Sequence, residues 1–258
     1  TGSSLMYSTF IGGSGSDGGN GIAIDMEGNA YIIGYTVDNT TVYPTTSGAY
    51  DTTHNGNDDV FVTKLNSNGS SLVYSTFLGG SWVDRGHGIA IDMEGNAYVT
   101  GYSSYYSSGT VFPTTSGAYD TTHNGNDDVF VTKLNSTGSS LVYSTFIGGY
   151  SQDRGNGIAI DTEGNAYITG QTKVYEDESD FPTTPGAYET RHNGWDDVFV
   201  TKLDPTGCFL IYSTFIGGSW IDRGHGIAID TEGNTYITGY TGAGYPTTPG
   251  AYDTTYNG

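Results

Sequence analysis

The chain has 258 residues, of which 41 are glycine and 22 tyrosine, with 14% charged residues and a net charge of −20. This length suits one large domain or two small ones and is enough to bury a core. The composition is typical of short strands joined by glycine-rich turns, whereas a helical protein needs far more Leu, Ala, Glu and Lys. The negative charge repels phosphate backbones and argues against nucleic-acid binding. No apolar run approaches membrane-spanning length.

The chain contains three complete copies and one partial copy of the same sequence repeat. The motif YSTF begins at spacings of 67, 69 and 69 residues, at Tyr7, Tyr74, Tyr143 and Tyr212. GIAID keeps these spacings at residues 21–25, 88–92, 157–161 and 226–230. DDVFVTKL occurs three times, at residues 58–65, 127–134 and 196–203. We therefore treat residues 1–258 as a single array of repeats at about 1–67, 68–136, 137–205 and 206–258, the last without its third strand.

Taken in chain order, the predicted strands are of four kinds, which repeat along the chain: outer, inner, second and third. These are an outer strand at 5–13 (LMYSTFIGG), an inner strand at 21–25 (GIAID), a second strand at 29–35 (NAYIIGY), a third strand at 59–65 (DVFVTKL) and the next outer strand at 72–80. They are rich in β-branched and aromatic residues and are bounded by Gly, Asn, Asp and Ser. Short glycine-containing turns predict hairpins between inner and second strands and between third and outer strands. No segment keeps a 3.6-residue period, so we expect almost no helix.

Four antiparallel strands with small residues in the first describe the blade of a β-propeller. The inner strand crowds the central axis, which suits Gly and Ala, and neighbouring sheets bury the Tyr, Phe, Ile and Val of the other strands. A β-solenoid is the rival all-β fold, but its coils are nearer 20–30 residues. We predict an all-β β-propeller of four-stranded antiparallel blades of about 68 residues, with three complete repeats and a partial fourth.

The two ends of the chain leave this predicted ring incomplete. In a closed ring of four blades, the outer strand at 5–13 would join the last blade, which stops after its second strand at 234–240. An open end exposes unpaired backbone and invites pairing with another chain. We expect a piece of a longer repeat protein, or a subunit that a neighbour completes. A four-blade ring that lacks one strand is the alternative.

Long motifs carry a family resemblance. YSTFIGG, GIAIDxxGNAYITGxT, FPTTPGAYDTT and DDVFVTKLNxxGSSLVYSTFIGG resemble the SBBP family of β-propeller repeats, which are relatives of the NHL-type blade. The resemblance covers essentially the whole chain. It implies a propeller from large secreted or cell-surface proteins of bacteria and archaea, often beside adhesion-type modules, and the family label implies seven blades.

The connections differ between the two faces of the predicted disc. The outer–inner and second–third loops leave one face and vary between repeats, while the inner–second and third–outer turns leave the other face and are nearly constant. Variable loops on a rigid scaffold are where binding specificity usually lies. The candidate ligand-binding residues lie on the outer–inner loops and are Trp82, Asp84, Arg85, His87, Tyr150, Asp153, Arg154, Asn156, Trp220, Asp222, Arg223 and His225.

Two interpretations of these residues stay open. Aromatic side chains beside Asp, Asn, Arg and His suit stacking on, and hydrogen bonding to, sugars or a peptide. In the structural alternative, the Asp-Arg-Gly element at 84–86 and its copies contains an ion pair that pins the loop, with Asp in a turn and Gly at positive φ. The structural role is favoured for the Asp–Arg pair.

Catalysis and metal binding give two further expectations. No Ser–His–Asp order, HExxH, CxxC or glycine-rich phosphate loop is present, and the loop cluster recurs, so we expect no enzyme. Adjacent carboxylates are poor acid–base partners because neighbours on a strand point to opposite faces. The motif HNGNDD nevertheless offers oxygen ligands for Ca²⁺, whereas DMEGN at 25–29 is favoured as a hairpin turn. The candidate metal ligands are Asp58, Asp59, Asp127, Asp128, Asp196 and Asp197.

The sequence thus leads to an extracellular or cell-surface β-propeller with a structural or adhesive role. Its expected partners are other copies of itself or glycans, without nucleic acid and without a membrane span. A specific carbohydrate or peptide receptor is the alternative among binding functions, and a secreted hydrolase or lyase is the alternative from another class. The near-identity of the copies favours the structural role, because repeated equal surfaces suit polyvalent contact or assembly.

Overall fold

A computed structural model describes residues 2–37, 43–104, 108–174 and 181–258. The described residues form strands, turns and bends without a helix, which confirms the all-β prediction. The first blade contains β1 (Asp17–Ile24), β2 (Ala30–Val37), β3 (Asp58–Leu65) and β4 (Leu72–Leu78). The second contains β5 (Asp84–Ile91), β6 (Ala97–Ser104), β7 (Asp127–Leu134) and β8 (Leu141–Ile147). The third contains β9 (Gln152–Ile160), β10 (Ala166–Lys173), β11 (Asp196–Leu203) and β12 (Leu210–Ile216), and a last hairpin contains β13 (Arg223–Ile229) and β14 (Thr235–Tyr240).

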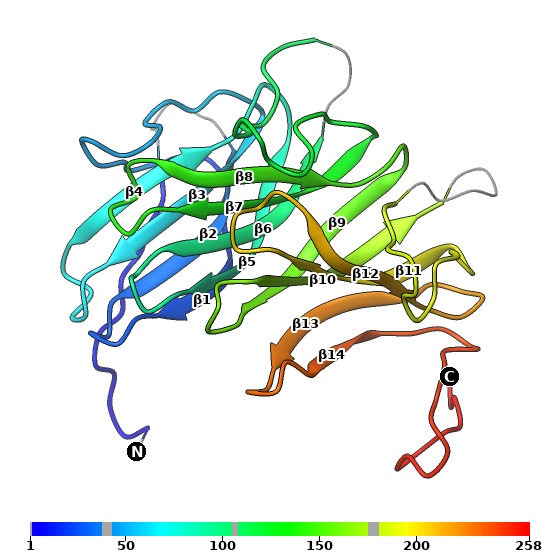
Figure 1. Cartoon of the computed structure of the whole chain (residues 1–258). Coiled ribbons are helices and arrows are strands. Elements are labelled where there is room, and N and C mark those ends of the chain that lie inside the picture. Colours follow the sequence, from blue (N-terminus) through cyan, green and yellow to red (C-terminus); the bar gives the residue numbers. More distant parts are fainter. Residues whose placement is uncertain (1, 38–42, 105–107, 175–180) are drawn as a thin grey trace.

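Within each blade the strands pair antiparallel in chain order, as the sequence predicts. Successive blades touch through parallel bridges between the start of a third strand and the following outer–inner loop. These bridges join Asp58 to Val83, Asp127 to Gln152 and Asp196 to Ile221. The inner strands β1, β5, β9 and β13 contact one another in that order, so the blades follow each other along an arc (Figure 1).

The hydrophobic core lies between the blades. One cluster joins Tyr31, Ile33 and Val62 of the first blade to Val99 and Phe130 of the second, and an equivalent cluster joins the second blade to the third. Side chains on both faces of the middle sheets are therefore buried, and every residue of β6 is buried. A single repeat exposes the apolar face that its neighbour covers here.

The inner strands begin earlier than the sequence predicts. The Asp-Arg-Gly element at 84–86 belongs to β5, not to a loop, and Gly86 does not have the positive φ that we expected there. Glycine is required instead for close packing, since a Cβ on Gly86 would lie 2.4 Å from Ile33 Cγ1 of the preceding blade. The expected positive φ does occur in the inner–second turn, at 82° for Gly28.

The two ends of the arc differ from the predicted ring. The predicted outer strand at 5–13 is not a strand, and Leu5, Met6 and Phe10 are exposed. The physical reason is that none of the described third strands lies beside this segment to pair with it. The two chain ends lie on opposite sides of the molecule (Figure 1), and the described sheets do not close into a ring. The four-blade ring is therefore not the arrangement of this chain.

Candidate functional site

The aspartates of the outer–inner loops are buried corner residues. Asp84 is almost fully buried, and its Oδ2 accepts a hydrogen bond from the Gly80 backbone N–H at 2.7 Å. The same contact recurs from Gly149 to Asp153 at 2.8 Å and from Gly218 to Asp222 at 2.7 Å. Each carboxylate thus closes its own loop and is not displayed to solvent.

The arginines of the same loops form ion pairs across the blade junctions. Arg85 Nη2 lies 2.6 Å from Asp58 Oδ2, and its Nε donates to the same oxygen at 2.7 Å. The equivalent Nη2–Oδ2 distance is 2.6 Å in the pairs Arg154–Asp127 and Arg223–Asp196. The expected ion pair exists, but its carboxylate is supplied by the third strand of the preceding blade and not by the adjacent Asp84.

The residue two positions after each arginine connects one blade to the next. His87 Nδ1 lies 3.0 Å from the Gly155 carbonyl oxygen, which can only accept, so this nitrogen is the donor. Asn20 and Asn156 make the same contact through Nδ2, to Gly86 O at 2.9 Å and Gly224 O at 2.8 Å. Burial lowers the pKa of His87, which favours the neutral ring. Histidine and asparagine can both fill this position because each can donate an N–H to the carbonyl of the next blade.

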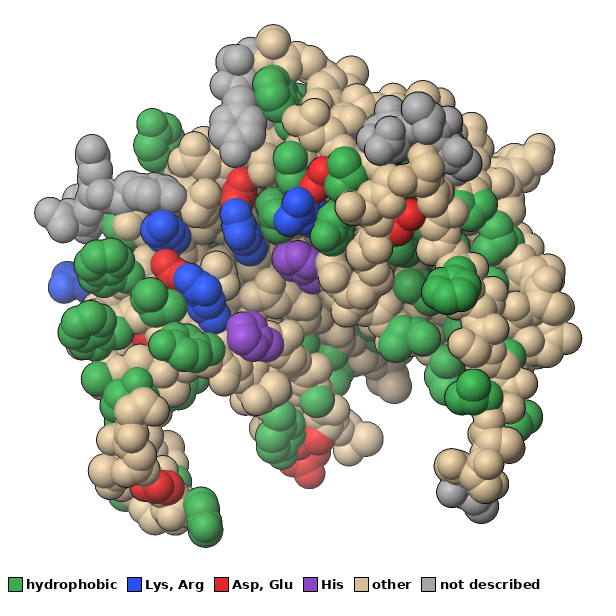
Figure 2. All heavy atoms as spheres, turned by 180° about the vertical axis from the view of Figure 1, so that it is seen from behind, with side chains coloured by type: hydrophobic (Ala, Val, Ile, Leu, Met, Phe, Trp, Pro, Cys, Tyr) green, Lys and Arg blue, Asp and Glu red, His purple; other side chains and the backbone are tan. Residues whose placement is uncertain are grey.

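Aromatic side chains remain exposed around the loops. Trp82 is half-buried, and its Nε1 donates to the Ser108 carbonyl at 2.8 Å, whereas Tyr150 is 74% and Trp220 58% exposed. Figure 2 shows one face of the molecule, where charged and His side chains lie side by side in the middle with hydrophobic side chains around them. The Trp195 side chain is also exposed, and the backbone N–H of Trp195 donates a hydrogen bond to the backbone carbonyl of Trp220 at 3.1 Å. Sequence reasoning missed Trp195, although HNGWDD replaces HNGNDD at that point.

Parts of the variable second–third loops that we expected to carry specificity, residues 38–42, 105–107 and 175–180, lie outside the described residues. His225, the last of the candidate ligand residues, is exposed, and no described strand follows the β13–β14 hairpin to contact it.

The candidate metal ligands separate into two environments. Asp58 is engaged by Arg85, while Asp59 points to the other face of β3, where its Oδ2 accepts the Asn55 N–H at 2.7 Å. Burial raises the pKa of Asp59 to about 6, and burial with the charges of Asp59 and Asp58 raises that of Asp84 to about 7. The adjacent aspartates therefore do not share one site. Within the described ranges, no group of three or more His, Cys, Asp or Glu side chains is arranged to take a metal ion.

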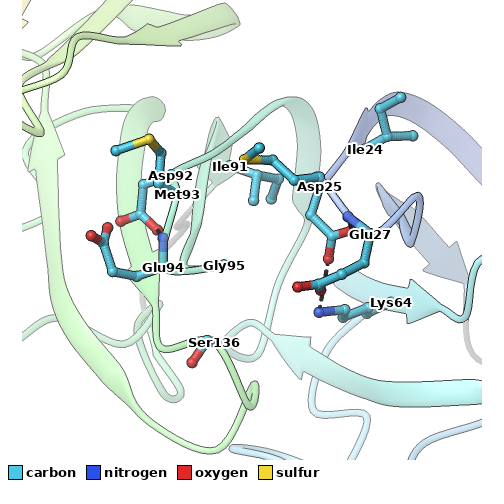
Figure 3. A pocket seen from close by; sticks show the side chains of 11 residues that line it. Ile24, Asp25, Glu27, Lys64, Ile91, Asp92, Met93, Glu94, Gly95 and Ser136 are labelled. Atoms are coloured by element: carbon cyan, nitrogen blue, oxygen red, sulfur yellow. Dashed lines mark hydrogen bonds and ion pairs between the residues drawn. The ribbon is translucent and has the colours of Figure 1, made fainter.

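Three equivalent clefts lie on the opposite face, between successive inner–second turns. The first cleft has a volume of about 180 Å³, and Figure 3 shows Glu27 and Lys64 on one side of it and Met93 and Glu94 on the other. Two equivalent clefts of about 390 and 400 Å³ follow at the next junctions. Sequence reasoning treated these turns as structural only, because their near-constancy gave no signal of a hollow between them.

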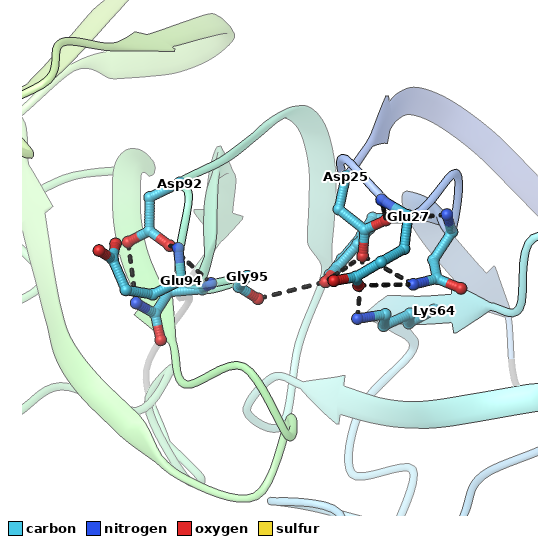
Figure 4. Close-up of polar contacts among 9 residues, drawn as sticks. Asp25, Glu27, Lys64, Asp92, Glu94 and Gly95 are labelled. Carbon is cyan, nitrogen blue, oxygen red and sulfur yellow. Dashed lines mark hydrogen bonds and ion pairs between the residues drawn. The ribbon is translucent and has the colours of Figure 1, made fainter.

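A network of polar contacts fixes each of these turns. Asp25 Oδ1 accepts the N–H groups of Glu27 and Asn29, at 3.1 and 2.9 Å. Its Oδ2 accepts from Asn29 Nδ2 at 2.8 Å and Tyr31 Oη at 3.2 Å, and Lys64 Nζ lies 3.1 Å away (Figure 4). Because both oxygens are occupied, Asp25 works as a hairpin residue and not as the start of a Ca²⁺ loop.

Comparison with known families identifies the repeat. The family model SBBP, described as a beta-propeller repeat, matches residues 7–39, 73–104, 142–176 and 211–246, which together make up more than half of the chain. The chain belongs to the SBBP beta-propeller repeat family. Each SBBP match begins at an outer-strand motif and reaches at least the end of the second strand, so it includes the loop Asp, the inner strand and the position of the blade-to-blade donor.

The curated proteins and the described secondary structure add little to the SBBP assignment. A search of curated proteins gives no match to the chain. Among the described residues, no helix has the length and apolarity to cross a membrane.

Proposed function

We propose that this SBBP array is an extracellular or cell-surface structural and adhesive module without catalytic activity, and that its end blades pack against further repeats of the same kind. The observation that carries the proposal is a contrast between equivalent positions. Ile22 of β1 is 69% exposed, whereas its counterpart Ile89 in β5 is 9% exposed; Tyr236 of β14 is 60% exposed, whereas its counterpart Tyr98 in β6 is fully buried.

Each end thus presents half of the interface that the interior junctions complete. Covering a large apolar side chain contributes about 1.5–3 kcal/mol, so the exposed Ile22, Ile24, Tyr236 and Tyr240 favour association. The surface that fits them is the opposite face of another blade, since the interior junctions pair these two faces. An extended apolar surface of this kind marks an interaction site.

A non-catalytic role is supported by what the most reactive side chains of the loops do. Arg85 is committed to Asp58, and the carboxyl of Asp84 closes its loop. His87, which would be the candidate base, donates to the next blade with its ring largely buried. The same roles recur at each junction. The extracellular location is supported by the resemblance of the motifs to repeats of secreted proteins.

Sedimentation velocity from about 1 to 100 µM tests the assembly. We expect the wild-type chain to form larger species as its concentration rises, and a variant with Ile22→Lys and Tyr236→Lys to remain monomeric. The matched control carries Trp82→Ala and Trp220→Ala, which remove two loop aromatics that are not among these end-face residues, and is expected to associate like the wild type. Monomeric wild type at the highest concentration, or dissociation of the control alone, would overturn the proposal.

Recognition of a carbohydrate or peptide is a second candidate function, favoured by the exposed Tyr150, Trp195 and Trp220 on the loops. Aromatic side chains of this kind supply stacking area at low entropic cost. A glycan array probed with the wild type and with Trp220→Ala tests it. Loss of a wild-type signal in that variant supports a receptor, and absence of any signal for the wild type removes the glycan hypothesis.

A further inference from the structure

Each blade junction contains two buried aspartates that face each other from neighbouring blades. At the first junction they are Asp59 of β3 and Asp84 of β5, both at most 1% exposed. The point where a Cβ on Gly79 would lie is 2.6 Å from Asp59 Oδ1 and 3.1 Å from Asp84 Oδ2. Only a glycine leaves room for both carboxylates at that point. We call these residues and their counterparts the junction aspartates: Asp59, Asp84, Asp128, Asp153, Asp197 and Asp222.

The arrangement recurs at the other junctions. A Cβ on Gly148 would lie 3.1 Å from Asp128 Oδ1 and 3.0 Å from Asp153 Oδ2. At the third junction the charge of Asp222 raises the pKa of Asp197, after burial as the main cause. The two carboxylates face the same glycine at two junctions, and the effect of Asp222 on Asp197 indicates that they are also close at the third.

In each pair, the aspartate of the third strand has one oxygen without a hydrogen-bond partner in the described parts of the chain. Oδ1 of Asp59, of Asp128 and of Asp197 is buried without a hydrogen bond, while Oδ2 of each accepts one backbone N–H. The described ion pairs do not include these three carboxylates. Arg85 is already engaged by Asp58, and the nearby His54 lowers the pKa of Asp59 by its charge but forms no described ion pair with it.

Two junction aspartates that are both ionised and have no counter-ion would destabilise the folded protein. A buried carboxylate loses its hydration, and two of them at short range also repel each other. Native proteins satisfy more than nine-tenths of their buried polar groups, and a recurrent exception points to an ion or water that completes it. The compensating species here is either a proton shared by the pair or a cation between them.

We propose that each blade junction binds one Ca²⁺ ion through the carboxylates of its two junction aspartates. Carboxylate oxygens from two separate strands are ligands that this hard cation prefers, and it takes 6–8 oxygens, so water completes the shell. With only two protein carboxylates, we expect a Kd of about 10⁻⁴–10⁻³ M, the range of extracellular modules. This site differs from the one that the sequence indicated, because Asp84 takes the place of Asp58.

Equilibrium dialysis with radioactive Ca²⁺, and thermal unfolding of chelator-treated protein with and without 5 mM CaCl₂, test the proposal. We expect about three ions per chain, one for each junction, and a Tm increase of about 5 °C or more. The triple variant Asp59→Asn, Asp128→Asn, Asp197→Asn is expected to bind no Ca²⁺ and to show no Tm increase. The single variant Asp59→Asn, which disturbs the fold least, is expected to lose one ion.

The matched control removes three carboxylates of equal charge from exposed turns on the other face, through Glu27→Gln, Glu94→Gln and Glu163→Gln. It is expected to keep both the stoichiometry and the Tm increase. Equal losses in the control and the triple variant would show diffuse attraction to an acidic surface and overturn the proposal. It is also overturned if the wild type binds no Ca²⁺ while the Asn variants are simply more stable above pH 7, because the pair would then share a proton.

Discussion

The aspartates at the two faces of each blade have opposite environments. Asp25, at the inner–second turn, has both oxygens occupied. Desolvation opposes its ionisation, but hydrogen bonds from Asn29 and Lys64 outweigh that and lower its pKa to about 2. Asp59, at the junction, has one unpartnered oxygen and no ion pair, and burial raises its pKa to about 6. The depth of burial and the number of donors around a carboxylate together decide which way its pKa moves.

The largest predicted effect comes from removing an aspartate of the inner–second turn, which tests whether its polar network stabilises the fold. Asp25→Ala deletes the hydrogen bonds that hold the turn and leaves Lys64, whose side chain is 11% exposed, without a counter-ion. We expect the free energy of unfolding to fall by about 3 kcal/mol, measured by urea denaturation. Glu27→Gln in the same turn is exposed and is expected to change it by less than about 0.5 kcal/mol. Equal effects of the two substitutions would show that the network around Asp25 adds no stability.

The pH dependence of stability separates the two faces in one experiment without divalent cations. The contribution of Asp25 is present above its unfolded pKa near 4 and is lost as the pH falls toward 2. The junction aspartates behave in the opposite sense, because Asp59 and Asp84 hold their protons in the folded state up to about pH 6 and 7. Their contribution is lost as the pH rises through those values.

Urea unfolding at a series of pH values is therefore expected to show maximal stability near pH 4–5, with a loss of about 2 kcal/mol between pH 5 and 8. Saturating Ca²⁺ is expected to reduce the alkaline loss. A free energy of unfolding that rises steadily from pH 5 to 8 in chelator would contradict the raised pKa values of the junction aspartates.

The smallest predicted effect concerns the hydrogen bond that crosses each junction. His87→Asn places the residue of Asn20 and Asn156 at this position, and we expect the unfolding free energy to change by less than about 0.5 kcal/mol. His87→Ala removes the donor to Gly155 O and is expected to cost about 1 kcal/mol. Chemical denaturation of both variants measures the difference. A large loss in the Asn variant would show that the ring itself, and not its N–H, is needed.

Much of the fold could be predicted from the sequence because its signals are local. The repeats of GIAID and DDVFVTKL gave the strands, and the Gly in DMEGN gave the hairpins. The partner of Arg85 could not be predicted, since Asp58 lies 27 residues earlier and across a junction. The first YSTF motif matches its copies but does not form a strand, because strand formation depends on a neighbour that this segment lacks. The proximity of Asp59 and Asp84 could not be predicted for the same reason, because the two residues belong to neighbouring blades.

The donor that links each blade to the next has an evolutionary consequence. Asn20, His87 and Asn156 all bind the carbonyl of a glycine that stands one repeat later in the same motif. A blade therefore needs from its successor only features that the second, third and fourth copies share, whereas the first copy has Gly18 in place of the junction arginine. Genetic duplication or deletion of a whole unit of about 69 residues leaves every remaining junction chemically complete. Array length can drift by unequal recombination without a matching change elsewhere in the gene.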